Sequence, residues 1–317
     1  MLNKIEIQGL YGLYNYKLDF TEGEDRRLKI ITGPNGYGKT TVLQLIYALF
    51  CKDFSVFFRI LFSHIVFTMD DDIIQVKQNR EKEPVEEESD LPGKETVSIS
   101  FEHVDVKSGS SMLLQTLTEQ EKDAKIDGQL EIVLNSMKCF FLTDERILLR
   151  KEEKEQRVQN ADTESSMMGV ASKVSEIIAK GENQKGIALF RELVAFFKFA
   201  DKEMVVDGTF GIRFKINNAS KSLIPVTALS SGEKHVLLQL FELIFEGKSG
   251  DLVMIDEPEL SFHPAWLNVY VSVLEIIQNF KKQEGREMQI ILATHSPILV
   301  GGRWDETLDL YNLRNNG

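Results

Sequence analysis

Apolar and polar residues alternate along the first part of the chain in a pattern typical of half-buried strands. Residues 4–10 and 14–20 alternate in this way, and residues 27–32 read as a buried strand that leads into a glycine-rich stretch. Apolar residues then recur at helical spacing over residues 40–50. Residues 64–78 alternate again around three aspartates, which predicts a hairpin with Asp70–Asp72 at its turn.

The last third of the chain changes to a different rhythm. A helical pattern over residues 233–245 precedes a short apolar run at 251–257, and a second helical pattern at 264–280 precedes an apolar run at 288–294. Helices that alternate with buried strands predict a parallel sheet covered by helices. The middle region, 104–200, is less regular, with helices predicted over 118–137 and 185–200.

Composition narrows the class of protein. Hydrophobic residues make up 43% and charged residues 27% of the chain, which is ordinary for a folded soluble protein. The net charge of -12 argues against nonspecific nucleic-acid binding by the whole surface, although a local basic patch stays open. Two cysteines, Cys51 and Cys139, predict no disulfide framework and fit a reducing cytoplasm. No secretory signal or membrane-spanning segment is expected, so we predict a soluble cytoplasmic protein.

The glycine-rich stretch "GPNGYGKT" at 33–40 has the spacing of a P-loop between a strand and a helix. Glycines let the backbone wrap a phosphate chain, and the helix N-terminus adds partial positive charge. We predict that Lys39 reaches the β- and γ-phosphates of ATP and that Thr40 ligates Mg²⁺. The alternative is a glycine-rich turn that matches by accident. The predicted nucleotide-binding residues here are Gly33, Asn35, Gly36, Gly38, Lys39, Thr40 and Thr41.

A second motif, "LVMIDE" at 252–257, ends a predicted buried strand with two acids. Asp256 is expected to hold Mg²⁺, and Glu257 is expected to polarise the attacking water as general base. Two acids that merely close a strand are the alternative. The P-loop elsewhere in the chain makes the Walker B interpretation the better one.

Four motifs in order carry a family resemblance. After the P-loop come "LSSGE" at 229–233, "MIDEPELSFHP" at 254–264 and "ILATHSP" at 291–297. The chain resembles ABC-type ATPases, most of all the non-transporter branch that contains RecF, SMC proteins and OLD-type phage-defence ATPases. This resemblance implies an α/β fold: an ABC-type P-loop ATPase with a mixed core sheet, an N-terminal antiparallel β subdomain and a helical lobe.

The resemblance also implies a domain division and further site residues. We expect one domain over 1–317, with a nucleotide-binding core at 1–103 and 201–317 and a variable helical lobe at 104–200. In the family, the signature motif contacts the γ-phosphate held by another protomer, which assigns this role to Ser230, Ser231 and Gly232. An ATP-dependent head-to-tail dimer would follow. Taken alone, "LSSGE" is equally well a helix N-cap.

Three further residues take their roles from the same resemblance. His295 occupies the place of the switch histidine near the γ-phosphate. His263 lies in the D-loop, which meets the partner protomer. Relatives carry a glutamine after a strand resembling 139–149, and here Glu145 fills that place beside Arg146. Glu145 is therefore a candidate metal ligand, while an exposed charged pair at a strand end is the alternative.

The function predicted first is an ATP-hydrolysing dimeric switch that controls a partner effector, as in compact anti-phage systems similar to Septu, PARIS and OLD. Alternatives are a DNA-repair or chromosome ATPase, a transporter subunit, or a scaffold that binds ATP and barely hydrolyses it. No Toprim-like acidic cluster follows His295, and the chain is expected to lack nuclease activity of its own. The effector, a nuclease or toxin, should then be a separate polypeptide, with nucleic-acid sensing left open and no membrane partner.

Overall fold

The computed structural model describes most of the chain. The described residues are 1–22, 27–82, 95–106, 109–121, 128–134, 139–142, 163–199, 201–217, 222–246 and 252–314. Glu145 and Arg146 lie outside these ranges.

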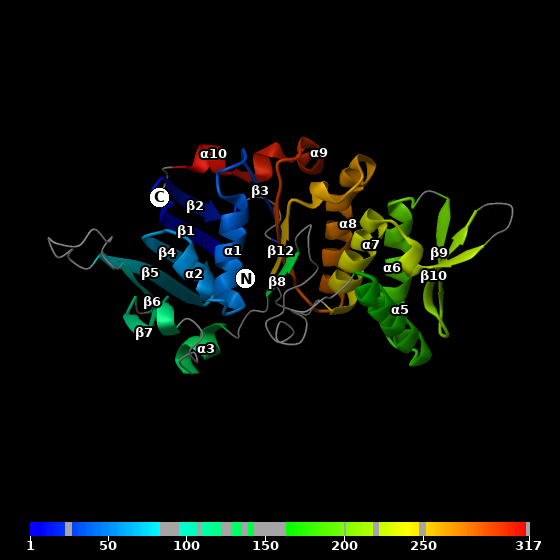
Figure 1. Ribbon diagram of the computed structural model, residues 1–317, viewed down its shortest axis with the longest axis horizontal. Coiled ribbons are helices and arrows are strands. Elements are labelled where there is room, and N and C mark those ends of the chain that lie inside the picture. The colour runs from blue at the N-terminus through cyan, green and yellow to red at the C-terminus, as the bar shows by residue number, and fades with distance from the viewer. Residues whose placement is uncertain are drawn as a thin grey trace, which may run out of the picture.

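An antiparallel six-stranded sheet forms one end of the molecule, in the order β2-β1-β4-β5-β6-β7 (Figure 1). Every pairing in it joins neighbours by antiparallel hydrogen bonds, as the alternating sequence pattern predicts. The predicted hairpin is confirmed: β4 and β5 are joined by Asp70 and Asp71, while Asp72, which was also expected at the turn, is the first residue of β5. The strands are β1 (Leu2–Leu10), β2 (Tyr14–Asp19), β4 (His64–Met69), β5 (Asp72–Lys82), β6 (Glu95–Asp105) and β7 (Ser111–Thr118).

A five-stranded sheet with the order β14-β3-β13-β12-β8 forms the centre. All four pairings between its described strands are parallel, so the antiparallel pairing expected of a mixed core sheet is found instead in the neighbouring sheets. Because parallel strands end at the same edge, the segments after β3, β12 and β13 lie together. The strands are β3 (Leu28–Thr32), β8 (Cys139–Leu142), β12 (Leu252–Asp256), β13 (Gln289–Ala293) and β14 (Thr307–Asp309).

Helices cover both faces of the core sheet. Figure 1 shows α1 between the core and the six-stranded sheet, with α8 and α7 on the other side and α5 and α6 beyond them. A small sheet, β11-β10-β9, closes the far end. The main helices are α1 (Lys39–Phe50), α5 (Thr163–Ala179), α6 (Gln184–Phe196), α7 (Ser231–Phe241) and α8 (Pro264–Gln283). Shorter ones are α2 (Ser55–Arg59), α3 (Gly128–Leu134), α9 (Pro297–Val300) and α10 (Leu310–Leu313), and the strands of the small sheet are β9 (Lys202–Asp207), β10 (Gly211–Ile216) and β11 (Leu223–Pro225).

Two hydrophobic cores lie on opposite faces of the central sheet. Alternate side chains of β12 enter them: Leu252 and Met254 join the core around α1, while Val253 and Ile255 join the core around α5–α8. The strand is buried on both faces, which explains its continuous apolar sequence. Burial on both faces fixes the position and orientation of Asp256, the last residue of the strand, and of Glu257, which follows it.

The middle region contributes to the sheets as well as to the helices. β7 and β8 fall within 104–200, and β8 is an edge strand of the core sheet. The predicted helix at 185–200 is confirmed by α6, while α3 covers only part of the predicted helix at 118–137, much of which lies outside the described residues. The division into a core and a helical lobe stays a prediction.

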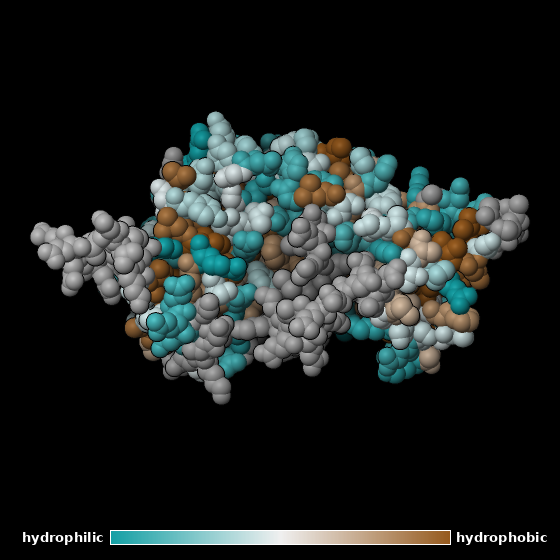
Figure 2. All heavy atoms as spheres, in the orientation of Figure 1, coloured by the Kyte–Doolittle hydropathy of each residue, from teal (hydrophilic) through white to brown (hydrophobic). Residues whose placement is uncertain are grey.

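The surface mixes polar and apolar residues. Figure 2 shows an apolar area at the end of the molecule that carries α5, β9 and β10, where Met168 and Phe210 are exposed. No helix among the described residues is long and apolar enough to cross a membrane.

Gly211 allows the packing of α5 against β10 to be tested. It adopts a φ of 69°, and a Cβ at this position would lie 1.8 Å from the carbonyl oxygen of Ala171 in α5. Gly12 has the same φ of 69° but no atom within 4 Å of its Cβ position. Each alanine substitution places a residue with a side chain in a left-handed backbone conformation, which costs about 1–2 kcal/mol.

We expect Gly211→Ala to lower the free energy of unfolding by about 1–3 kcal/mol more than Gly12→Ala, because α5 must move away from β10. Urea titration of both variants measures this difference. Equal losses would show that α5 and β10 do not pack as described.

Candidate functional site

The loop between β3 and α1 has the backbone of a phosphate-binding turn. Gly36 and Gly38 adopt φ values of 86° and 85°, and Gly38 is the N-cap residue of α1. Glycine takes this left-handed conformation without the steric cost that a side chain imposes. The loop therefore presents backbone N–H groups at a helix N-terminus, which is a suitable environment for an anion.

Lys39 begins α1 and turns back over this loop. Its Nζ donates to the carbonyl oxygen of Gly33 at 3.0 Å and lies 3.2 Å from Oε1 of Glu257. The side chain is 5% exposed, so its charge is nearly buried and needs these partners. The ion pair joins the P-loop directly to the end of β12.

Thr40 and Asp256 have the chemistry of magnesium ligands. Thr40 is exposed in the first turn of α1, and Asp256 is buried as the last residue of β12. A hydroxyl and a carboxylate are hard oxygen donors, which Mg²⁺ prefers, so the two residues fit this ion. Thr41 is buried, and its hydroxyl lies 3.1 Å from that of Tyr11, a contact that the sequence did not predict.

Glu257 sits in a strained backbone conformation. Its φ of 46° is left-handed, although it is not a glycine and precedes Pro258, which disfavours helical conformations. Its N–H donates to the carbonyl oxygen of Ala293 at 2.9 Å, so the neighbouring strand β13 holds the turn. Such strain is typical of functional sites, where it fixes the direction of a side chain.

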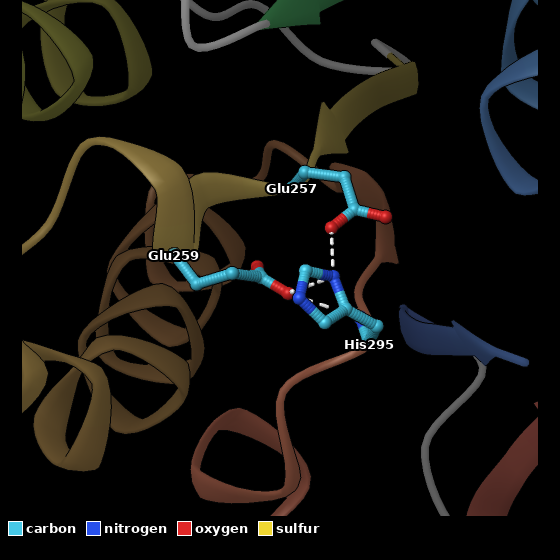
Figure 3. A group of neighbouring side chains, drawn as sticks. All are labelled: Glu257, Glu259 and His295. Carbon is cyan, nitrogen blue, oxygen red and sulfur yellow. Dashed lines mark hydrogen bonds and ion pairs between the residues drawn. The ribbon is translucent and has the colours of Figure 1, made fainter. Parts of the chain in front are cut away.

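His295 lies two residues after the end of β13, and its side chain points toward Glu257. Figure 3 shows its ring between the carboxylates of Glu257 and Glu259. Nδ1 makes a short contact with Oε2 of Glu257 and lies 3.2 Å from Oε1 of Glu259. The ring is 44% exposed, so its outer side can meet a ligand. The predicted base and the predicted switch histidine are thus in direct contact.

Glu259 is a site residue that the sequence analysis missed. It lies in the short 3-10 turn Pro258–Leu260, and its side chain is 7% exposed. One oxygen, Oε1, accepts hydrogen bonds from the Thr294 hydroxyl and from the backbone N–H groups of His295 and Ser296. The available signal was the second glutamate of "DEPE", which falls two residues after the base.

The signature segment forms the start of α7. Ser230 is its N-cap and shares a reciprocal capping box with Glu233, as the alternative interpretation predicted. Glu233 also accepts from Lys202 of β9 at 2.7 Å. Burial alone would raise the pKa of Glu233, but the hydrogen bonds from Lys202 and Ser230 outweigh it and lower this pKa below its ordinary value.

The signature helix packs tightly on the D-loop. A Cβ at Gly232 would lie 3.0 Å from the carbonyl oxygen of Ser261 and 3.2 Å from the Trp266 ring. Residues of both segments, including Ser230 and His263, line one cavity of about 750 Å³. His263 is also the N-cap of α8, where its Nδ1 accepts from the N–H of Ala265. Ser231, between Ser230 and Gly232 in the chain, is exposed.

The structure brings together the predicted residues of three motifs and leaves the fourth apart. Lys39, Glu257 and His295 meet at the carboxyl edge of the core sheet. The helix that carries the P-loop packs in the core on one face of this sheet, whereas α7 packs in the core on the other face. Glu145 lies outside the described residues, and its assignment stays a prediction.

Comparison with known families agrees with this arrangement. A profile for the "AAA ATPase domain" matches residues 1–189, and one described as "AAA domain, putative AbiEii toxin, Type IV TA system" matches residues 140–301. The chain belongs to the AAA ATPase domain family. This confirms the ATPase resemblance expected from the four motifs, and the P-loop of this AAA ATPase domain protein lies within the first matched range.

The chain was also compared with curated protein sequences and with solved structures. No curated protein sequence matches the chain. Among solved structures it is similar to the Smc head domain with an extended coiled coil, bound to the C-terminal domain of ScpA, from Pyrococcus furiosus. The identity is 14% and the TM-score 0.41, over 94% of this chain and 90% of that chain.

The Glu233–Lys202 pair predicts a pH-dependent stability. Because the pKa of Glu233 is lowered in the folded protein, its ionised form stabilises the fold above the ordinary value of 4.5. This contribution disappears as the pH falls through the lowered pKa. At pH 7 we expect Glu233→Gln to lose about 1–3 kcal/mol of unfolding free energy, since a charged hydrogen bond is removed.

Urea titration of the wild type and Glu233→Gln between pH 7 and pH 3 tests this, and the two curves should converge below pH 4.5. Glu131→Gln is the control, because Glu131 pairs with Lys52 at the surface and should contribute under about 1 kcal/mol. A difference for Glu233→Gln that does not change with pH would contradict the assignment.

Proposed function

We propose that this chain is an ATP-hydrolysing switch that acts as a head-to-tail pair and controls a separate effector. The observation that carries the proposal is the meeting of Lys39, Glu257 and His295 at one edge of the core sheet. Membership of the AAA ATPase domain family supports ATP as the substrate.

ATP binding is assigned to the P-loop. Its glycines and the N-terminus of α1 direct N–H groups toward the phosphates, and Lys39 exchanges part of its pairing with Glu257 for the β- and γ-phosphates. Thr40 and Asp256 would hold Mg²⁺, with Glu145 as a third candidate. When bound, this ion supplies positive charge that stabilises the charge developing on the phosphates.

Hydrolysis is assigned to the strained turn after β12. Glu257 accepts a proton from the attacking water as general base. His295 contacts this carboxylate, and its exposed side would meet the γ-phosphate. The left-handed backbone of Glu257 and the contact with His295 keep the base in one orientation, which favours reaction by reducing the reorganisation needed.

A pair of chains would complete the site. The signature belongs to α7, which packs on the opposite face of the core sheet from α1, and this supports a role at the P-loop of another chain. In a head-to-tail pair, Ser231 and Gly232 would face the γ-phosphate held by the partner protomer. The cavity beside the D-loop, lined by Ser230 and His263, would then lie at the interface.

The effector is proposed to be a separate protein of the toxin or nuclease class, acting in anti-phage defence. The matched profile that names a toxin of a type IV toxin–antitoxin system supports this setting. ATP-driven opening and closing of the pair would restrain or release the effector. Sensing of nucleic acid by the pair stays an open part of the proposal.

Lys39→Ala tests nucleotide binding. We expect ATP affinity to fall by about 100-fold or more, because charge-assisted hydrogen bonds to the phosphates are lost. Lys52→Ala is the matched control, since Lys52 follows the other end of α1 and pairs with Glu131. Calorimetric titration with a non-hydrolysable ATP analogue measures both, and unchanged affinity in Lys39→Ala would remove the P-loop assignment.

Glu257→Gln tests the switch. The variant should bind ATP, lose turnover by about 100-fold or more because its base is gone, and accumulate as an ATP-bridged pair. Light scattering with and without ATP measures the mass, and phosphate release measures turnover. Glu275→Gln, which alters a surface pair with Arg303, should leave both unchanged.

Ser230→Arg in the Glu257→Gln background should block the ATP-dependent mass increase by placing a large cation at the signature. Ser230→Thr keeps the capping hydroxyl without this bulk and should still pair. If ATP changes the mass of neither the wild type nor Glu257→Gln, the head-to-tail pair is wrong. ATP turnover by the wild type would not be affected by that result.

A further inference from the structure

We propose that Glu259 is a positioning residue that aims His295, by fastening the loop after β13 to the turn after β12. The inference rests on the proposed ATPase function and adds a residue to it that none of the four motif assignments includes. It starts from one buried carboxylate oxygen that accepts three hydrogen bonds.

The three donors come from consecutive residues. Oε1 of Glu259 accepts from the hydroxyl of Thr294, from the N–H of His295 at 3.0 Å and from the N–H of Ser296 at 3.1 Å. The N–H of Ser296 also lies 2.9 Å from the Thr294 hydroxyl. Thr294 is fully buried, so the Thr294 end of this fastening is shielded from water. Hydrogen bonds to a shielded carboxylate are stronger than those at the surface.

The same three side chains could suggest a metal site, because ligand atoms of Glu257, Glu259 and His295 lie within 4.8 Å of one another. Their existing contacts favour a different role. Oε1 of Glu259 already accepts from three protein donors, and Oε1 of Glu257 pairs with Lys39. A cation bound through Oε1 of either glutamate would have to displace these contacts. Oε2 of Glu259 is buried without a hydrogen-bond partner among the described residues, and whatever meets it leaves the three donors on Oε1 in place.

The fastening keeps base and histidine at a fixed separation. Glu257 and Glu259 belong to one turn, and this turn is bonded to the segment after β13 at two places: Glu257 N–H to Ala293, and Glu259 to residues 294–296. The backbone of His295 therefore cannot move away from Glu257 without breaking the hydrogen bonds to Glu259. A shift of about 1 Å in a reacting group can slow a reaction about 100-fold.

Glu259→Ala should therefore reduce kcat for ATP hydrolysis by about 10–100-fold while the Kd for ATP changes by less than about threefold, since the P-loop is untouched. Glu259→Gln keeps a carbonyl oxygen in the place of Oε1 and should recover most of kcat. Thr294→Val removes one donor at constant shape and should reduce kcat less than Glu259→Ala. The double variant should lose less than the product of the two single losses, because both act on one network.

Glu275→Ala is the control for the loss of a glutamate nearby in the sequence and should keep wild-type kcat. Thermal unfolding of each variant checks that the fold survives. A fall in kcat that Gln does not restore, or one that parallels an equal loss of ATP affinity, would overturn the proposal, as would an unchanged kcat in Glu259→Ala.

Amide hydrogen exchange gives a readout that does not depend on turnover. The N–H groups of His295 and Ser296 should be protected in the wild type and exchange faster in Glu259→Ala, but not in Glu275→Ala. If the wild type hydrolysed no ATP, the proposed function would fail. The exchange data would then still decide whether Glu259 fastens this loop, and unchanged protection would overturn that claim.

Discussion

The ion pair between Lys39 and Glu257 connects two parts of the site that lie far apart in the sequence. Lys39 belongs to the helix after β3 and Glu257 to the turn after β12, and β13 separates their strands in the core sheet. The pair is possible only because the sheet is parallel, which brings the ends of all three strands to one edge. Glu257 also contacts His295, which lies two residues after β13, the strand between β3 and β12.

The left-handed backbone at Glu257 costs about 1–3 kcal/mol of strain. Several contacts offset it. The N–H of Glu257 donates to the carbonyl oxygen of Ala293, and its carboxylate contacts Lys39 and His295. The next residue, Pro258, begins a short 3-10 turn. A relaxed backbone at this point would turn the carboxylate away from the P-loop. The strain is therefore located where direction of the base matters most.

Much of the site could be predicted from the sequence because its motifs are contiguous. The P-loop at 33–40 and the two acids that end β12 need only their own neighbours to be recognised. The contacts that complete the site were not visible, since they join distant positions: Glu259 reaches Thr294 across 35 residues, Lys202 reaches Glu233 across 31, and Tyr11 reaches Thr41 across 30. No local pattern encodes such pairings.

In the fold, too, local features were predicted from the sequence and long-range ones were not. Alternation predicted the hairpins and the buried strands, because burial on one or both faces leaves a direct mark on the sequence. The order of strands in the core sheet leaves no such mark. That β8 lies beside β12, and β14 beside β3, depends on how the chain crosses between layers. The parallel character of the core sheet was predicted from the alternation of helices with buried strands in the last third of the chain, and the four parallel pairings confirm it. The mixed core sheet came from the family resemblance alone.

The segment from Asp256 to Trp266 links the two surfaces that the proposed function needs. It begins at the end of β12, carries Glu257 and Glu259 at the site edge, and then passes Ser261, on whose carbonyl oxygen Gly232 of the signature helix packs. The chain between base and signature contact is thus only a few residues long and is fixed at both ends by buried contacts. The turn that carries Glu257 and the packing of the predicted signature helix therefore depend on the same short segment of the chain.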